Sequence, residues 1–176
     1  MAGRIAVVSA MREELHALHA DLSAPRIARA AGREFHLGAL HDRPVLLVLS
    51  GIGKVAAATT TALLLDRFAV DAILFTGVAG GLGAGVQVGD VVIGDVLLQH
   101  DLDASPIFPR WEVPLTGKSR FTADSAWSDA LADAARATGH AVHRGLIVSG
   151  DRFVSTSAES KALRAALPDA LAVEME

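Results

Sequence analysis

The stretch RIAVVSAMREELHALHADL, residues 4–22, decides the fold class of this chain. Residues 4–9 form a continuous, β-branched segment, which is typical of a strand buried on both faces. The segment that follows places Leu15, Leu18 and Leu22 at helical spacing. A buried strand that leads directly into a helix is the usual first unit of an α/β chain.

The same alternation continues along the rest of the chain. We expect helices at residues 11–22, 54–69, 125–139 and 157–167. We expect strands at residues 4–9, 34–40, 43–50, 71–75, 88–99, 141–149 and 170–174. This pattern predicts one α/β domain over residues 1–176, with a three-layer α/β/α sandwich and a mixed central sheet.

Several details of these elements can be predicted as well. The strands 34–40 and 43–50 should form a hairpin, and the segment 88–99 should be one strand or a bent pair. The helix 54–69 is mostly apolar, so we expect it to be covered on several sides. A serine should cap the start of the helix 157–167.

Composition excludes several classes of protein. The chain has 176 residues, of which 51% are hydrophobic and 20% charged, which excludes a disordered chain or a coiled coil. The net charge is −4 without a basic run, so neither nucleic acid nor an anionic membrane is an expected partner. Cysteine is absent, which excludes disulfides and thiolate metal sites.

The chain also shows no targeting or membrane segment. Its N-terminal apolar stretch is too short for a signal peptide. No segment approaches the roughly 18 apolar residues that cross a membrane. We therefore expect a cytoplasmic globular protein.

The predicted strands end in polar or glycine-rich segments. These are Ser9 to Met11, SGIG at 50–53, TGVAGG at 76–81, SGD at 149–151 and EME at 174–176. Glycine lets the backbone approach a ligand closely, although each glycine alone is equally explained by a tight turn. Neither glycine-rich loop matches a dinucleotide fingerprint or a P-loop. The five strand ends together indicate a small-molecule site at one sheet edge.

Two acidic residues follow the first strand. Glu13 and Glu14 lie in the first turn of the predicted helix, where acids interact favourably with the helix dipole without any catalytic role. The run from His100 to Asp103 contains metal-ligand residue types but lacks further ligands, so we predict no metal site.

Seven motifs together resemble those of the nucleoside phosphorylase/nucleosidase superfamily and, within it, of the 5′-methylthioadenosine/S-adenosylhomocysteine nucleosidases. The motifs are AMREE, SGIGKVAAA, TGVAGGL, VGDVVI, QHDLD, SGDRFV and AVEME. They cover residues 4–176 in the order and spacing of the family. The resemblance implies a nucleoside phosphorylase-like fold, no cofactor, and hydrolysis of the N-glycosidic bond of adenine nucleosides with release of adenine.

The resemblance also assigns roles to individual residues. Glu14 would hold and activate the attacking water, and Glu176 would bind the ribose 2′ and 3′ hydroxyls and stabilise the cationic sugar. Phe153 would stack on the purine, and the backbone of Val154 would hydrogen-bond the purine edge. Carboxylates suit this chemistry because the transition state carries positive charge on the sugar, and because a carboxylate can deprotonate water.

The remaining implied contacts surround the sugar and its 5′ substituent. Met175 would pack under the ribose, and Glu174 is its neighbour in the motif. Met11 and Ile52 would line the alkylthio pocket.

The resemblance further implies a homodimer. Ala104 and Ile107 occupy positions at which the partner subunit would close the alkylthio pocket, and both are smaller or less aromatic than the family's common choices. The loop 102–110 should expose Ile107 and Phe108, which is costly in water unless a second copy covers them.

Water, and not phosphate, is the expected nucleophile. Related hexameric purine phosphorylases carry an arginine at the position of Phe75 and a serine at that of Val78. Both phosphate donors are missing here, and phosphate needs such donors. Val78 would therefore line a site for the nucleoside alone.

In the family, the chain continues after VEME with a segment that includes a further core strand and a terminal helix. That segment holds the aspartate that protonates the leaving purine, and we expect it to be absent from this chain, which ends at Glu176. Two alternatives stay open: a nucleosidase for another purine nucleoside such as aminofutalosine, and a non-catalytic nucleoside-binding paralogue.

Overall fold

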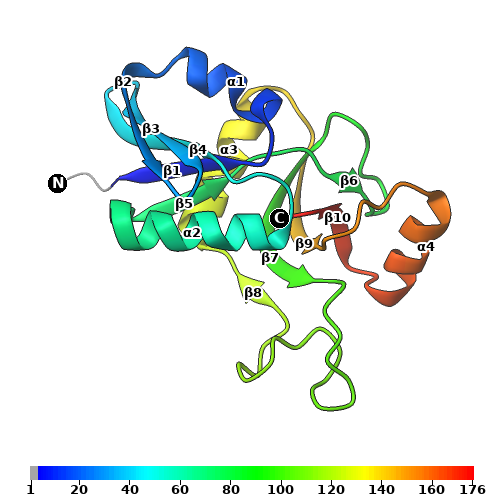
Figure 1. Cartoon of the computed structure of the whole chain (residues 1–176). Coiled ribbons are helices and arrows are strands. Elements are labelled where there is room, and N and C mark those ends of the chain that lie inside the picture. Colours follow the sequence, from blue (N-terminus) through cyan, green and yellow to red (C-terminus); the bar gives the residue numbers. More distant parts are fainter. Residues whose placement is uncertain (1–3) are drawn as a thin grey trace. The chain divides into compact units, whose positions relative to one another are not determined.

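The computed structural model describes residues 4–176. The chain forms two compact units, of which one ends at Val78 and also includes Glu176, and the other spans Ala79–Met175. We call them the N-terminal unit and the C-terminal unit. Each contains one five-stranded sheet, and Figure 1 labels the strands and helices.

The sheet of the N-terminal unit is mixed, with the strand order β2-β3-β4-β1-β5. Its elements are β1 (Ile5–Ser9), α1 (Arg12–Ala20), β2 (Ser23–Ala30), β3 (Arg33–Leu40), β4 (Arg43–Leu49), α2 (Lys54–Phe68) and β5 (Ala72–Phe75). β1 runs parallel to β4 and β5, whereas β3 is antiparallel to both β2 and β4. The predicted α/β class with mixed strand directions is confirmed.

Both faces of this sheet are covered. On one face Ala6, Val8 and Phe35 pack with Leu64 of α2. On the other face residues of β1 and β4 pack with Leu15 of α1. Helix, sheet and helix therefore form three layers within the N-terminal unit, and burial on both faces explains why the sequences of β1 and β4 are continuously apolar.

The predicted hairpin is confirmed. Leu40 pairs with Arg43 across the turn, and the two residues between them, His41 and Asp42, have φ angles of 46° and 62°. A two-residue turn with both φ angles positive matches the right-handed twist of the paired strands.

Two features of the N-terminal unit differ from the predictions. β2 was not predicted, because its sequence SAPRIARA is mostly exposed and lacks an apolar face. The helix α2 is not covered on several sides: Thr60 and Leu64 are buried, but Val55 and Leu65 are 78% and 58% exposed. Small residues make α2 look apolar throughout, although only one stripe of it is packed.

The sheet of the C-terminal unit has the strand order β6-β10-β9-β7-β8. Its elements are β6 (Gly80–Gly81), β7 (Val91–Gln99), β8 (Phe121–Thr122), α3 (Ser125–Ala137), β9 (Val142–Ser149), α4 (Ser157–Ala166) and β10 (Ala170–Glu174). β9 runs parallel to both β7 and β10. β7 is one strand with a register shift between Gly94 and Val96, so the first of the two predictions for this segment is confirmed.

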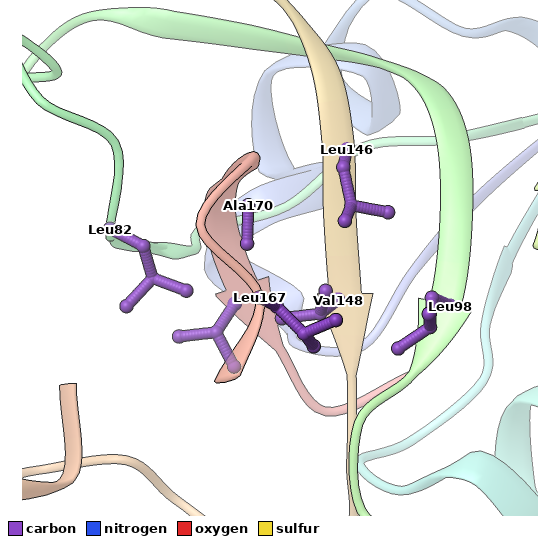
Figure 2. Packing of buried hydrophobic residues seen from close by; sticks show 7 residues of the cluster. Leu82, Leu98, Leu146, Val148, Leu167 and Ala170 are labelled. Atoms are coloured by element: carbon purple, nitrogen blue, oxygen red, sulfur yellow. The ribbon is translucent and has the colours of Figure 1, made fainter. Parts of the chain in front are cut away.

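A cluster of buried aliphatic side chains holds the C-terminal unit together (Figure 2). Leu98 comes from β7 and Val148 from β9, while Leu167 follows α4. These side chains are at most 3% exposed, so they fix the strands whose carboxyl ends carry the predicted nucleoside-binding residues.

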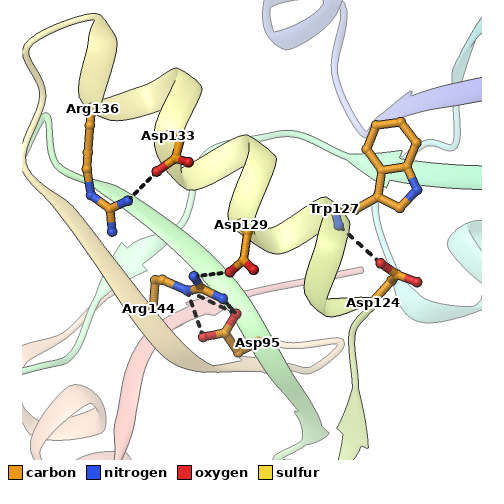
Figure 3. A network of polar contacts seen from close by, with 7 residues as sticks. All are labelled: Asp95, Asp124, Trp127, Asp129, Asp133, Arg136 and Arg144. Atoms are coloured by element: carbon orange, nitrogen blue, oxygen red, sulfur yellow. Dashed lines mark hydrogen bonds and ion pairs between the residues drawn. The ribbon is translucent and has the colours of Figure 1, made fainter.

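Ion pairs attach α3 to the same sheet (Figure 3). The Arg144 guanidinium of β9 donates to Asp95 of β7 at 2.9 Å and also to Asp129 of α3. Both carboxylates raise the pKa of Arg144 above its ordinary value, and Asp95 contributes most. Asp124 caps α3 by accepting a hydrogen bond from the backbone N–H of Trp127. These charged side chains therefore serve to hold α3 on the sheet.

Candidate functional site

The carboxyl ends of β1, β4 and β5 are joined by direct hydrogen bonds. The backbone N–H of Ser50 donates to Ser9 O at 2.9 Å, and that of Thr76 donates to Val8 O at 3.0 Å. The buried Ser9 hydroxyl donates to Thr76 O at 2.7 Å. The polar segments that follow these three strands therefore lie at one edge of this sheet, whereas the predicted ends at 149–151 and 174–176 belong to the other sheet.

Glu14 lies at this edge, with its carboxylate held by three backbone N–H groups. Oε2 accepts from Ala10 at 3.0 Å and from Met11 at 2.9 Å, and Oε1 accepts from Val78 at 2.9 Å. A carboxylate offers about four lone-pair positions, so these three donors leave one acceptor position on Oε1. Hydrogen bonds to an ionised group are strong and directional, so they fix the orientation of the carboxylate.

The hydrogen bond between Glu14 and Val78 is not explained by helix capping. The bond to Met11 is the usual contact of a glutamate in the first turn of a helix, and it stabilises α1. The bond to Val78 joins residues 64 positions apart and adds nothing to the helix start. Glu13, in contrast, is exposed to solvent. Of the two acids, only Glu14 is thus built into the strand-end edge.

Gly77 makes this arrangement possible. A Cβ atom added at Gly77 would lie 2.9 Å from Glu14 Oε1 and 3.3 Å from its Cδ, which is closer than side chains pack. The absence of a side chain at this position therefore lets the carboxylate reach the backbone of the loop.

Apolar side chains are exposed at the ends of the three strands and in the segments that follow them. Met11 and Val78, whose N–H groups bind the Glu14 carboxylate, are 38% and 75% exposed, and Ile52 in the loop after β4 is 57% exposed. Phe75 at the end of β5 is 43% exposed. Phe75 and Val78 offer no guanidinium or hydroxyl to an anion.

Arg33, which was not singled out from the sequence, fixes the loop that carries Ile52. Its guanidinium donates to Thr60 Oγ1 at 2.6 Å, to Ala56 O at 3.1 Å and to Ser50 O at 3.4 Å. These bonds join the start of β3 to α2 and to the end of β4. Sequence spacing gives no signal for such a contact, because it depends on the hairpin register.

In the C-terminal unit the ends of β7, β9 and β10 are joined in the same way. His100 N donates to Ser149 O at 2.9 Å, and Gly150 N donates to Glu174 O at 3.2 Å. Asp151 N donates to Asp101 Oδ2 at 2.8 Å. The segments that carry Phe153, Glu174 and the loop after β7 therefore meet at one edge of this sheet.

The loop after β9 presents an aromatic side chain. Phe153 is 74% exposed, whereas the next residue, Val154, is half-buried against the core cluster. The loop ends at Thr156, whose side chain caps α4 by accepting from Glu159 N. The predicted serine cap is therefore wrong: the capping residue is the threonine one position earlier, and it forms a capping box with Glu159.

The long loop after β7 leads to β8 (Figure 1). Ile107 is 82% exposed, as predicted, but Phe108 is half-buried, so the prediction for Phe108 is wrong. Ala104 is also half-buried. Packing of Phe108 within its own chain leaves Ile107 as the exposed apolar side chain of the segment 102–110.

The last three residues, Glu174, Met175 and Glu176, are all half-buried. Glu174 closes β10, opposite Ser149 of β9. Glu176 belongs to the same compact unit as Glu14, whereas Met175 belongs to the C-terminal unit.

Within residues 4–176, no three histidine, aspartate or glutamate side chains gather in a way that could hold a metal ion. No helix in this part of the chain is long and apolar enough to cross a membrane.

The family model described as the phosphorylase superfamily matches residues 4–176. The chain belongs to this superfamily. It is 36% identical over 173 residues to the 5′-methylthioadenosine/S-adenosylhomocysteine nucleosidase of Staphylococcus saprophyticus, covering 98% of this chain and 75% of that one. It is 34% identical to the nucleosidase of the same name from Aeromonas salmonicida, with 98% and 76% covered. These identities place it in the nucleosidase family within the superfamily.

Solved structures agree with this placement. The Neisseria meningitidis nucleosidase bound to methylthio-immucillin-A superposes with a TM-score of 0.94 at 40% identity, with 99% of this chain and 76% of that one covered. The Streptococcus pneumoniae nucleosidase bound to a transition-state inhibitor gives 0.90 at 36% identity, with 98% and 75% covered. The predicted family and the nucleoside phosphorylase-like fold are confirmed.

Proposed function

We propose that this protein hydrolyses the N-glycosidic bond of 5′-methylthioadenosine and of S-adenosylhomocysteine-type adenine nucleosides, and releases adenine. The observation that carries the proposal is the Glu14 carboxylate, held by three backbone N–H groups at the edge where β1, β4 and β5 end. Family membership supplies the type of reaction, and Glu14 supplies a base for the water.

Glu14 acts on water in this mechanism. The remaining acceptor position on Oε1 orients a water molecule whose oxygen bonds to the anomeric carbon of the ribose as the bond to adenine breaks. The water proton passes to the carboxylate, and adenine leaves with the electron pair of the broken bond and takes up a proton from solvent. A base positioned in this way contributes typically 10²–10⁴-fold to the rate.

The apolar character of the β5 end favours hydrolysis over phosphorolysis. A phosphate nucleophile requires charged or hydroxyl donors. Phe75 and Val78 present carbon atoms instead, and the Val78 N–H is already bonded to Glu14.

We assign the nucleoside to the residues that the family resemblance implies. Phe153 stacks on adenine, with the backbone of Val154 at the base edge. Met175 and Glu174 flank the ribose, and Met11, Ile52 and Val78 line the 5′ side. The exposure of Phe153, at 74%, leaves its ring available to a ligand.

Glu176 binds the ribose hydroxyls in this proposal. A hydrogen bond to a charged group contributes about 1.5–3 kcal/mol. Replacing Glu176 by glutamine should therefore weaken ligands with a 2′-hydroxyl more than their 2′-deoxy analogues, as measured by titration calorimetry. Equal losses in the two ligand series would remove Glu176 from the ribose.

The protein acts as a homodimer in this proposal, with Ala104 and Ile107 closing the partner's pocket. Support comes from α2, where Val55, Ala58, Ala62 and Leu65 are all exposed and recur at intervals of three and four residues, as one helix face does. An exposed apolar stripe of this kind marks an interaction surface.

Replacing Leu65 by glutamate should convert the dimer to a monomer, because a charge would be buried without a partner in the stripe. Light scattering at micromolar concentration measures the change. Val88→Glu is the matched control, since Val88 is fully exposed and lies outside α2. Monomeric wild-type protein would contradict the homodimer.

Release of adenine from 5′-methylthioadenosine, S-adenosylhomocysteine and aminofutalosine, and of hypoxanthine from inosine, tests the proposal as a whole. Preference for the first two supports it, and preference for aminofutalosine selects the alternative nucleosidase. Binding of adenine nucleosides without release of adenine would identify a non-catalytic paralogue. A cytoplasmic location stays a prediction from the sequence.

A further inference from the structure

The loop that carries Phe153 poses a mechanical problem. The Phe153 side chain is 74% exposed, so packing within the chain does not fix its ring. Its position depends on the backbone of residues 152–156. A base stacks more tightly on a ring that is already held in one orientation, because ordering a free ring costs conformational entropy.

The Glu159 carboxylate binds residues on both sides of Phe153 in this loop. Glu159 Oε2 accepts from Ser155 N at 3.2 Å, from Thr156 N at 3.0 Å and from Thr156 Oγ1 at 2.9 Å. Its other oxygen, Oε1, accepts from the guanidinium of Arg152. Glu159 thus binds Arg152, which precedes Phe153, as well as Ser155 and Thr156, which follow it.

Helix capping explains only part of this arrangement. The bond from Thr156 N is the reciprocal half of the capping box at the start of α4. The contacts with Arg152 and Ser155 lie outside the helix and contribute nothing to its start. The hydrogen bond from the Arg152 side chain is the largest cause of a pKa of Glu159 lowered to about 2, so the carboxylate is ionised at neutral pH.

We infer that Glu159, together with Arg152, is a positioning residue that holds the Phe153 loop in the conformation that receives the adenine base. The inference rests on the proposed function, since it takes Phe153 as the stacking platform. It adds a specificity element that lies on α4 and acts through the loop.

Arg152→Ala separates positioning from helix capping. This variant keeps the capping box of Thr156 and Glu159, and an ion pair whose arginine is 68% exposed contributes little to stability. We expect an unchanged melting temperature, a KM for 5′-methylthioadenosine raised by roughly 5- to 30-fold, within the range of a lost base stack, and a smaller change in kcat. Asp124→Ala, which removes the cap of α3 and none of the contacts of Glu159, should lower the melting temperature and leave KM unchanged.

Glu159→Ala should raise KM more than Arg152→Ala does, and Glu159→Gln should recover part of the loss because its amide oxygen still accepts from the loop. Phe153→Ala should weaken binding by roughly 5- to 150-fold, the usual effect of one lost base stack. In the Phe153→Ala background, Arg152→Ala should cost nothing further, since its effect passes through the ring.

The outcomes separate the inference from the proposed function. If Phe153→Ala weakens binding but Arg152→Ala and Glu159→Ala leave KM within twofold, the positioning role is overturned and the stacking role stands. An Arg152→Ala effect that persists without Phe153 also overturns it, because Arg152 would then contact the substrate directly. If Phe153→Ala has no effect, the assignment of the base to Phe153 fails, while adenine release still tests the reaction independently.

Discussion

Replacing Glu14 by glutamine should lower kcat for 5′-methylthioadenosine at least ~10²-fold and leave nucleoside affinity within about tenfold, on the scale of one general base. Glutamine has nearly the same shape, but its amide cannot take a proton from water. It also cannot satisfy all three backbone donors, because its NH₂ group must face either Val78 or the pair Ala10 and Met11. The water would therefore lose its base, and the side chain at position 14 would lose its fixed orientation.

Glu13→Gln is the matched control for this variant. Glu13 lies in the same helix turn and carries the same charge, but its side chain is exposed. A general effect on the dipole of α1 would appear in both variants, whereas loss of the base appears only in Glu14→Gln. Rates of adenine release give kcat, and calorimetry with a non-hydrolysable adenine nucleoside gives affinity. Full activity of Glu14→Gln would remove Glu14 from the reaction.

The elements that were predicted well are those whose own residue pattern indicates that they are buried. β1 and β4 are apolar throughout because both faces are covered, and the hairpin between β3 and β4 is marked by two polar residues that accept positive φ. The sequence of β2 has no such pattern. β2 is an exposed edge strand with two arginines and a proline, held by pairing with β3.

The same distinction applies to the candidate site. Residue spacing placed Glu13 and Glu14 in one helix turn, and only the family resemblance singled out Glu14. The contact that distinguishes the two acids in the structure reaches Val78, 64 positions away. The capping box of Thr156 and Glu159 has the usual spacing, but the sequence-based prediction assigned the cap to a serine and was wrong. The additional bond to Arg152 could not be predicted, since it depends on the fold of the loop.

Gly77→Ala should cost nearly as much activity as Glu14→Gln, although it changes no group that touches the substrate. The added Cβ would meet Glu14 Oε1 at 2.9 Å and Phe75 Cε1 at 3.4 Å. The atom that must yield is the end of a flexible side chain, so we expect the protein to fold with a similar melting temperature while the carboxylate moves away from Val78. A displacement of about 1 Å can cost 10²-fold in rate, and we expect a loss of kcat on that scale.

Two comparisons make this result specific to Glu14. Gly80→Ala is the matched substitution three residues later, in β6, and its Cβ would meet the Val173 side chain at 3.3 Å and no carboxylate. It should keep most of the activity. In the Glu14→Gln background, Gly77→Ala should add little further loss, because both changes remove the same oriented carboxylate and their effects do not add. If Gly77→Ala is fully active, or if its loss multiplies that of Glu14→Gln, then Gly77 does not act by admitting Glu14.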